Sequence, residues 1–119
     1  MALSENLPIY KDGYDLLERL TDLAENLPKF YRFSYGYRMI DTCLDLLDWV
    51  YRANSSMEKR QEMLIELLSY YRRLQMMLRV CFHRKAISSG RYAELILLLD
   101  SIGKQATAWK NSTEVRNDE

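Results

Sequence analysis

The chain has 119 residues, 48% of them hydrophobic and 29% charged, and its formal net charge at pH 7 is zero. This length suits one domain with its own core, and the composition is that of a folded protein rather than a disordered one. No apolar run approaches the roughly 18 residues of a membrane span, and the N-terminus lacks a signal-peptide pattern, so we expect a cytoplasmic protein without a membrane partner.

The first predicted element is a helix over residues 12–26, preceded by a flexible arm at 1–11. Apolar side chains recur at helical spacing after Gly13, and Asp12 is suitably placed to cap the helix. Pro28 ends it, because the residue before a proline is disfavoured in the α region. The chain has only four glycines and two prolines, so long helices are favoured throughout.

The second predicted helix covers residues 29–53 and starts directly after Pro28, a residue well tolerated at a helix start. Its first stretch, within LPKFYRFSYGYRM at 27–39, is rich in aromatic and basic side chains. Most of these aromatics follow helical spacing, which indicates a core face, whereas Tyr31 lies off the main stripe and is a candidate for stacking on a base. The main apolar stripe consists of Phe30, Phe33, Tyr37, Ile40, Leu44, Leu47 and Tyr51. A second stripe beside it consists of Tyr35, Met39, Leu46 and either Trp49 or Val50.

The third and fourth predicted helices cover residues 57–85 and 88–110, and the polar segment 111–119 is predicted to be a disordered tail. Four helices with short connections predict an all-α fold, an antiparallel up-down-up-down four-helix bundle that forms a single domain over 12–110. The third helix has an apolar strip in addition to its core face, and such a helix usually makes two contacts. The predicted oligomer interface consists of Met63, Tyr70, Met77, Val80, Leu97 and Leu98.

The residues suited to catalysis are few. His83 is the only histidine and lies two positions from Cys81 in a helix, so these side chains point in different directions. Both Cys81 and Cys43 sit in apolar patterns and are expected to be core thiols. The sequence has no zinc or di-iron spacing and no phosphate-binding glycine loop, so we expect no metal, no cofactor and no enzymatic activity. Acids at helical spacing on the second helix are better explained by solvation or salt bridges than by acid–base catalysis. These acids are Asp41, Asp45 and Asp48.

Charge is distributed unevenly along this neutral chain. Residues 1–28 carry six acids and two bases, residues 111–119 carry three acids and one base, and residues 29–110 carry 14 bases and 8 acids. A basic middle part suits a polyanion, although ordinary solvated helix faces explain such a pattern equally well. If the second and third helices are antiparallel, the start of one lies near the end of the other, and their cations form one phosphate-binding surface. The predicted nucleic-acid-binding residues are Lys29, Arg32, Arg38, Arg72, Arg73, Arg79, Arg84 and Lys85.

Two stretches of the sequence carry a family resemblance. One combines Leu27-Pro28-Lys29 with Arg32-Phe33, Gly36 and a long amphipathic helix; the other runs from Ser88 to Trp109 and contains Ser101-Ile102-Gly103-Lys104. Over residues 12–110 the chain resembles the bacterial four-helix-bundle proteins encoded within intervening sequences of 23S ribosomal RNA genes. That family includes the accessory variability determinant (Avd) of diversity-generating retroelements. The resemblance implies a homo-oligomer, a pentameric barrel, with a basic surface for nucleic acid and no catalytic residues. In Avd-like members it implies a reverse transcriptase and its RNA template as partners.

Two functions therefore remain open. The first is a non-enzymatic, oligomeric accessory protein that binds RNA or another nucleic acid through its basic helix surfaces. The alternative is a protein-interaction scaffold that recruits a partner enzyme, such as a reverse transcriptase, without contacting nucleic acid. An enzyme that uses the three acids of the second helix is the least favoured interpretation.

Overall fold

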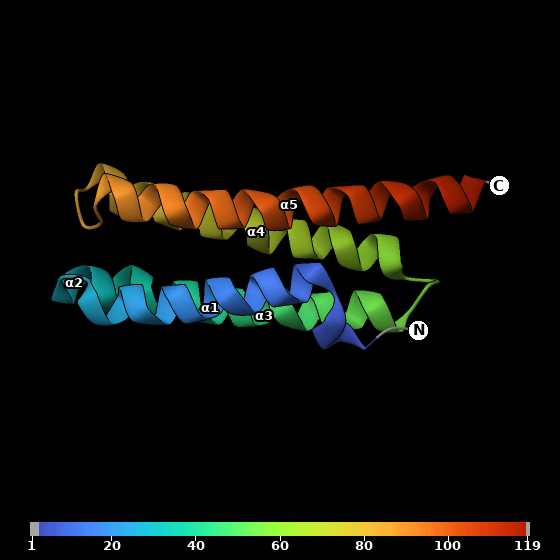
Figure 1. The fold of residues 1–119 in the computed structure, drawn as a ribbon, viewed down its shortest axis with the longest axis horizontal. Coiled ribbons are helices and arrows are strands. Elements are labelled where there is room, and N and C mark those ends of the chain that lie inside the picture. Colours follow the sequence, from blue (N-terminus) through green and yellow to red (C-terminus); the bar gives the residue numbers. More distant parts are fainter. Residues whose placement is uncertain (1–2, 119) are drawn as a thin grey trace.

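The computed structural model describes the backbone of residues 3–118 and the side chains of residues 3–113. It is an antiparallel up-down-up-down four-helix bundle with no strand in the described part, which confirms the predicted fold class (Figure 1). The bundle is elongated, with extents of 51 × 22 × 21 Å along its principal axes. Its elements are η1 (Ser4–Asn6), α1 (Pro8–Asn26), α2 (Lys29–Tyr31), η2 (Arg32–Gly36), α3 (Tyr37–Ser55), α4 (Arg60–His83) and α5 (Ser89–Asp118).

Helix α1 begins at Pro8, earlier than the sequence predicts. Proline suits this first helical position because it has no N–H to leave unpaired and its φ is already helical. Ile9 is buried in the core, so the flexible arm predicted at 1–11 is wrong in its length, and the first two residues lie outside the described part. Asp12 lies inside the helix instead of capping it, and its carboxylate accepts a hydrogen bond of 2.7 Å from Nε2 of Gln105 on α5.

Helix α5 continues to Asp118, where the sequence predicts a disordered tail over 111–119. Gly103 is the last glycine or proline of the chain, so nothing after it interrupts the helical hydrogen bonds. Thr113 is buried, and its hydroxyl donates a hydrogen bond to the carbonyl of Trp109. The predicted tail is therefore helical as far as it is described, and α5 extends past the other helices at one end of the bundle (Figure 1).

The second predicted helix is continuous over 29–55 but contains one π-helical turn, η2, between α2 and α3. The residues on both sides of this turn keep right-handed helical backbone angles, so the helix is not broken. A π turn inserts one extra residue and shifts the faces on its two sides relative to each other. Gly36 packs this turn closely on α1, since a Cβ there would lie 3.1 Å from the Cβ of Ala24.

The core face of α3 is its second apolar stripe and not its main one, so the aromatic core face predicted from the sequence is wrong. Both stripes have the helical period, but the buried face also carries the small side chains of Cys43 and Ala53, which let α1 and α4 approach α3 closely. Met39, Leu46 and Val50 of the second stripe are at most 1% exposed, and so are Cys43 and Ala53 on the same face of the helix. Tyr35 and Trp49 of this stripe are half-buried. The main stripe mostly faces solvent, and its members with 46–69% exposure are Phe30, Phe33, Tyr37, Leu44 and Tyr51.

Both cysteines are core thiols, as the sequence predicts. Cys43 and Cys81 are fully buried and neither forms a disulfide. Burial raises the pKa of the Cys43 thiol to about 12 and that of Cys81 to about 11, because the thiolate is disfavoured away from water. Neither thiol is therefore suited to act as a nucleophile in the folded protein.

Helix α4 ends at His83, and Lys85 follows it in the left-handed conformation with a φ of 62°. The N–H of Lys85 bonds to the carbonyl of Phe82 at 3.0 Å, and the N–H of Ala86 bonds to the carbonyl of Cys81 at 2.8 Å. This pair of hydrogen bonds is the Schellman arrangement that closes a helix C-terminus. Glycine usually occupies the left-handed position, because a Cβ is disfavoured there.

Replacing Lys85 with glycine is expected to raise the free energy of unfolding by about 0.5–1 kcal/mol, because the left-handed position then carries no Cβ. Urea denaturation followed by far-UV circular dichroism measures this change. The matched control is Arg84→Gly, at a neighbouring position with a φ of −84°, where glycine is expected to destabilise the protein. A Lys85→Gly variant less stable than the wild type would contradict the conformational argument.

Candidate nucleic-acid interface

The C-terminal end of α4 lies against the start of the second predicted helix at one end of the bundle. Nε of Arg84 donates a hydrogen bond of 3.3 Å to the hydroxyl of Tyr31. This hydrogen bond raises the pKa of Arg84 above its ordinary value. Tyr31 in turn stacks with Tyr35, with 6.3 Å between ring centroids and 25° between ring planes. The approach of these two helix ends, which the sequence predicts, is therefore confirmed.

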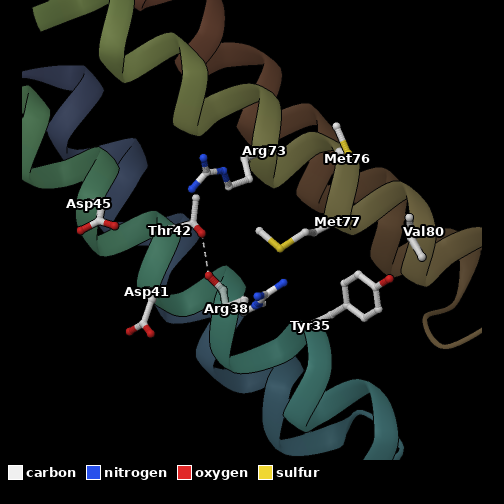
Figure 2. Close-up of a pocket in the computed structure, with 9 residues that line it drawn as sticks. All are labelled: Tyr35, Arg38, Asp41, Thr42, Asp45, Arg73, Met76, Met77 and Val80. Atoms are coloured by element: carbon white, nitrogen blue, oxygen red, sulfur yellow. Dashed lines mark hydrogen bonds between the residues drawn. The ribbon is translucent and has the colours of Figure 1, made fainter.

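A groove lies beside this end, between α4 on one side and η2 with α3 on the other. Its volume is about 570 Å³, which is in the range of small-molecule binding sites. Figure 2 shows Met77 between Arg38 from α3 and Arg73 from α4, with Tyr35 and Val80 toward one end. The groove thus combines two predicted nucleic-acid-binding residues with an apolar floor.

Seven of the eight predicted cations face solvent, and within the described residues no ion pair includes any of them. In contrast, two arginines at the contact of α1 with α5 form ion pairs. There Arg91 pairs with Asp22 at 2.7 Å, and Arg19 pairs with Asp15 at 3.0 Å. The seven solvent-facing cations are therefore available to an anionic partner. They are Lys29, Arg38, Arg72, Arg73, Arg79, Arg84 and Lys85.

Arg32, the eighth predicted cation, is turned toward the end of α1. Its guanidinium donates hydrogen bonds to the carbonyls of Ala24 at 3.2 Å, Glu25 at 3.0 Å and Leu27 at 3.2 Å. The last carbonyls of a helix have no partner inside it, so Arg32 satisfies groups that would otherwise need water. The structure therefore gives Arg32 a structural role, and its contact with phosphate stays a prediction.

Arg60 repeats this arrangement at the end of α3. Its guanidinium donates to the carbonyls of Ala53 at 2.8 Å and Asn54 at 3.2 Å, and it lies 5.3 Å from the ring of Trp109. The sequence analysis missed both capping arginines. A sequence pattern could have indicated both residues: an arginine near the start of one helix, five to eight residues after the last residues of the preceding helix, whose carbonyls it caps.

The residues of the predicted oligomer interface differ in their burial within a single chain. Met77 is buried in the core of a single chain, whereas Leu97 is 73% exposed. The half-buried residues of the set pack against this core or line the groove beside it. They are Met63, Tyr70, Val80 and Leu98. Helix α4 therefore uses its second apolar strip largely within the monomer, and the exposed main stripe of the second predicted helix is a larger apolar surface.

The three acids of α3 do not converge on a shared site. Asp48 pairs with Arg52 at 3.0 Å, and Asp41 and Asp45 point away from Met77 in Figure 2. The described residues contain no group of three or more His, Cys, Asp or Glu side chains placed to hold a metal ion. In the same part of the chain, no helix combines the length and apolar character of a membrane-spanning segment.

Comparison with known families gives one match. The family model described as bAvd-like matches residues 7–113, a range that includes all of α1, α3 and α4 and most of α5. A search of the curated proteins finds no significant match. The family match agrees with the resemblance to Avd proteins over 12–110 and with the four-helix bundle that the structure shows. The chain therefore belongs to the bAvd-like family.

Proposed function

We propose that this protein is a non-enzymatic, oligomeric accessory protein that binds RNA or another nucleic acid through its basic helix surfaces. The observation that carries this proposal is the set of seven exposed cations on α2, α3, α4 and the turn that follows α4, none of which is in an ion pair within the described residues. Such cations bind phosphate backbones, and affinity rises with the number of phosphates they neutralise.

Membership of the bAvd-like family supports the accessory role. From the resemblance to Avd we further propose a homo-oligomer of five subunits in the bacterial cytoplasm, with a reverse transcriptase and its RNA template as partners. The exposed main stripe supports self-association, because contiguous apolar patches on a folded surface usually mark an interaction site. Phe30 and Phe33, with exposed fractions of 69% and 57%, are its most prominent aromatics near the start of the helix.

Salt dependence tests the nucleic-acid contact. We expect the affinity for a fluorescein-labelled RNA, followed by fluorescence anisotropy, to fall about tenfold or more between about 50 and 200 mM salt, because phosphate contacts release counterions. In the double variant Arg79→Ala with Lys85→Ala, the dependence of log affinity on log salt is expected to become shallower by about 0.7–0.9 per lost contact.

The matched control for this experiment is Arg19→Ala with Arg91→Ala, which removes two cations that pair with acids at the α1–α5 contact. The control is expected to leave the salt dependence close to that of the wild type. An affinity that does not respond to salt would contradict the proposed function, and an equal loss in both double variants would contradict the proposed surface.

A second function is favoured by the exposed main stripe itself. In this alternative the aromatic surface recruits a partner enzyme, such as a reverse transcriptase, and the protein does not contact nucleic acid. Charge reversal at Lys29 and Arg79 distinguishes the two functions. Partner binding and partner activity that survive this reversal would favour the scaffold, whereas loss of RNA binding and activity together would favour the nucleic-acid-binding protein.

A further inference from the structure

The groove between α3 and α4 differs from the rest of the basic surface because it has an apolar floor between its cations. Arg38 and Arg73 reach it from opposite helices, and neither has an acidic partner among the described residues. Met77 lies between them, and Tyr35 stands toward one end (Figure 2). Cations alone fit any polyanion, whereas an aromatic ring and a thioether beside them fit a planar base next to its phosphate.

The aromatic surface continues from the groove toward the end of α4. Tyr35 stacks with Tyr31, and Arg84 donates its hydrogen bond to the hydroxyl of Tyr31. From Arg73 to Arg84 the rise along α4 is about 16 Å, so cations flank both ends of this row of rings. A duplex keeps its bases stacked on each other and offers only their edges, whereas an unpaired base presents its face to an aromatic side chain.

We propose that this groove binds single-stranded nucleic acid, with a phosphate between Arg38 and Arg73 and an unpaired base against Tyr35 and Met77. The inference rests on the proposed function and narrows it to one site and to unpaired strands. Tyr35 belongs to the π turn η2, and such turns are frequent at functional sites.

Two carboxylates limit where the phosphate lies. Asp41 and Asp45 line the same groove but point away from Met77 (Figure 2). Their charge repels phosphate from the outer side of α3, so the strand runs along α4 toward Tyr31 and Arg84. The double variant Asp41→Asn with Asp45→Asn is expected to bind single strands more tightly than the wild type does, by about two- to fivefold at low salt.

Fluorescence anisotropy with two labelled RNAs tests the preference for unpaired strands. The probes are an oligouridine of about ten nucleotides and a fully paired duplex of the same length. Tyr35→Leu is expected to weaken oligouridine binding by about fivefold or more, the range of one lost base stack. Arg73→Ala is expected to weaken it by a similar factor through the lost phosphate contact, and each variant is expected to change duplex binding less than about twofold. Leucine at position 35 keeps an apolar side chain in the groove, and circular dichroism confirms that each variant is folded.

The matched control is Arg72→Ala, which removes the same charge at the neighbouring position, outside the groove lining. It is expected to weaken both probes slightly and equally. A photocrosslink from 5-iodouridine in the oligouridine gives a second readout that does not depend on affinity. The crosslinked peptide is expected to contain Tyr35 or Met77, and crosslinks found only on other elements would overturn the assignment of the groove.

The outcomes separate this inference from the proposed function. Equal binding of both RNAs, with Arg72→Ala as damaging as Arg73→Ala, would overturn the single-strand groove and leave a general nucleic-acid-binding surface. If decaglutamate displaces oligouridine from the groove and binds with the same affinity, the groove would be assigned to an acidic protein partner and the single-strand inference would be overturned. Failure of both RNAs to bind at about 50 mM salt would overturn the inference and the proposed function together.

Discussion

Replacing Phe33 and Tyr37 together with glutamate is expected to convert the proposed oligomer into monomers of 14.2 kDa that keep the helical bundle. In a single chain these side chains are 57% and 46% exposed, so their replacement removes little from the core. They belong to the main stripe, and in the proposed oligomer the burial of this stripe between subunits would favour assembly. A glutamate in such a contact would bury an unpaired charge. Analytical ultracentrifugation measures the mass, and circular dichroism checks the fold.

Leu97→Glu is the matched control for the assembly experiment, because Leu97 is the most exposed residue of the interface predicted from the sequence. If the main stripe is the subunit contact, Leu97→Glu stays assembled. Dissociation by Leu97→Glu, with the assembly intact in the Phe33→Glu and Tyr37→Glu double variant, would place the contact on α5 instead. A wild-type protein that is monomeric at every concentration would contradict self-association itself.

Arg32→Ala is expected to lower the free energy of unfolding by about 2 kcal/mol without a specific loss of RNA affinity. The substitution leaves the carbonyls of Ala24, Glu25 and Leu27 without their charged donor, and hydrogen bonds to charged groups are worth more than neutral ones. The hydrogen bond to Glu25 is exposed and those to Ala24 and Leu27 are partly buried, so water replaces some of the lost bonds. Urea denaturation measures the stability, and anisotropy well below the unfolding temperature measures RNA binding.

Arg32→Lys separates the structural role from a contact with phosphate. Lysine keeps the positive charge, but its single ammonium group does not reproduce the fork of donors that reaches three carbonyls. We therefore expect Arg32→Lys to lose most of the stability that Arg32→Ala loses, while both variants bind RNA like the wild type. An RNA affinity that falls in Arg32→Ala and is restored in Arg32→Lys would return Arg32 to the nucleic-acid-binding surface.

The helix ends show where local sequence signals are sufficient. Pro28 separates α1 from the second helix as predicted, because the conformation before a proline depends only on that proline. The errors lie at the start of α1 and at the end of α5. Helix α1 starts at Pro8 instead of residue 12, because proline suits a first helical position and Gly13 is tolerated inside the helix. Helix α5 continues to Asp118, since a helix without a breaker can extend at little cost once it is formed.

The candidate site could be predicted from the sequence less completely than the helices, because its arrangement depends on tertiary structure. The sequence identifies the cations by type and predicts that two helix ends meet, which the hydrogen bond between Arg84 and Tyr31 confirms. It does not tell a free arginine from one that caps a helix, because that difference lies in what surrounds the guanidinium of Arg32. The groove likewise exists only because α3 and α4 pack side by side, which places Arg38 and Arg73 on its two sides.

By itself, the sequence determined four helices, because the helical period of apolar residues is a local property of the chain. It also determined their antiparallel direction, because the connections between them are short. Only the tertiary structure decided which stripe of α3 is buried. Both stripes are apolar with the same period, so burying either one would remove similar hydrophobic surface from water. The choice follows from steric fit: slim side chains such as Cys43 and Ala53 pack between α1 and α4, and the bulky aromatics Phe33 and Tyr37 are left facing solvent.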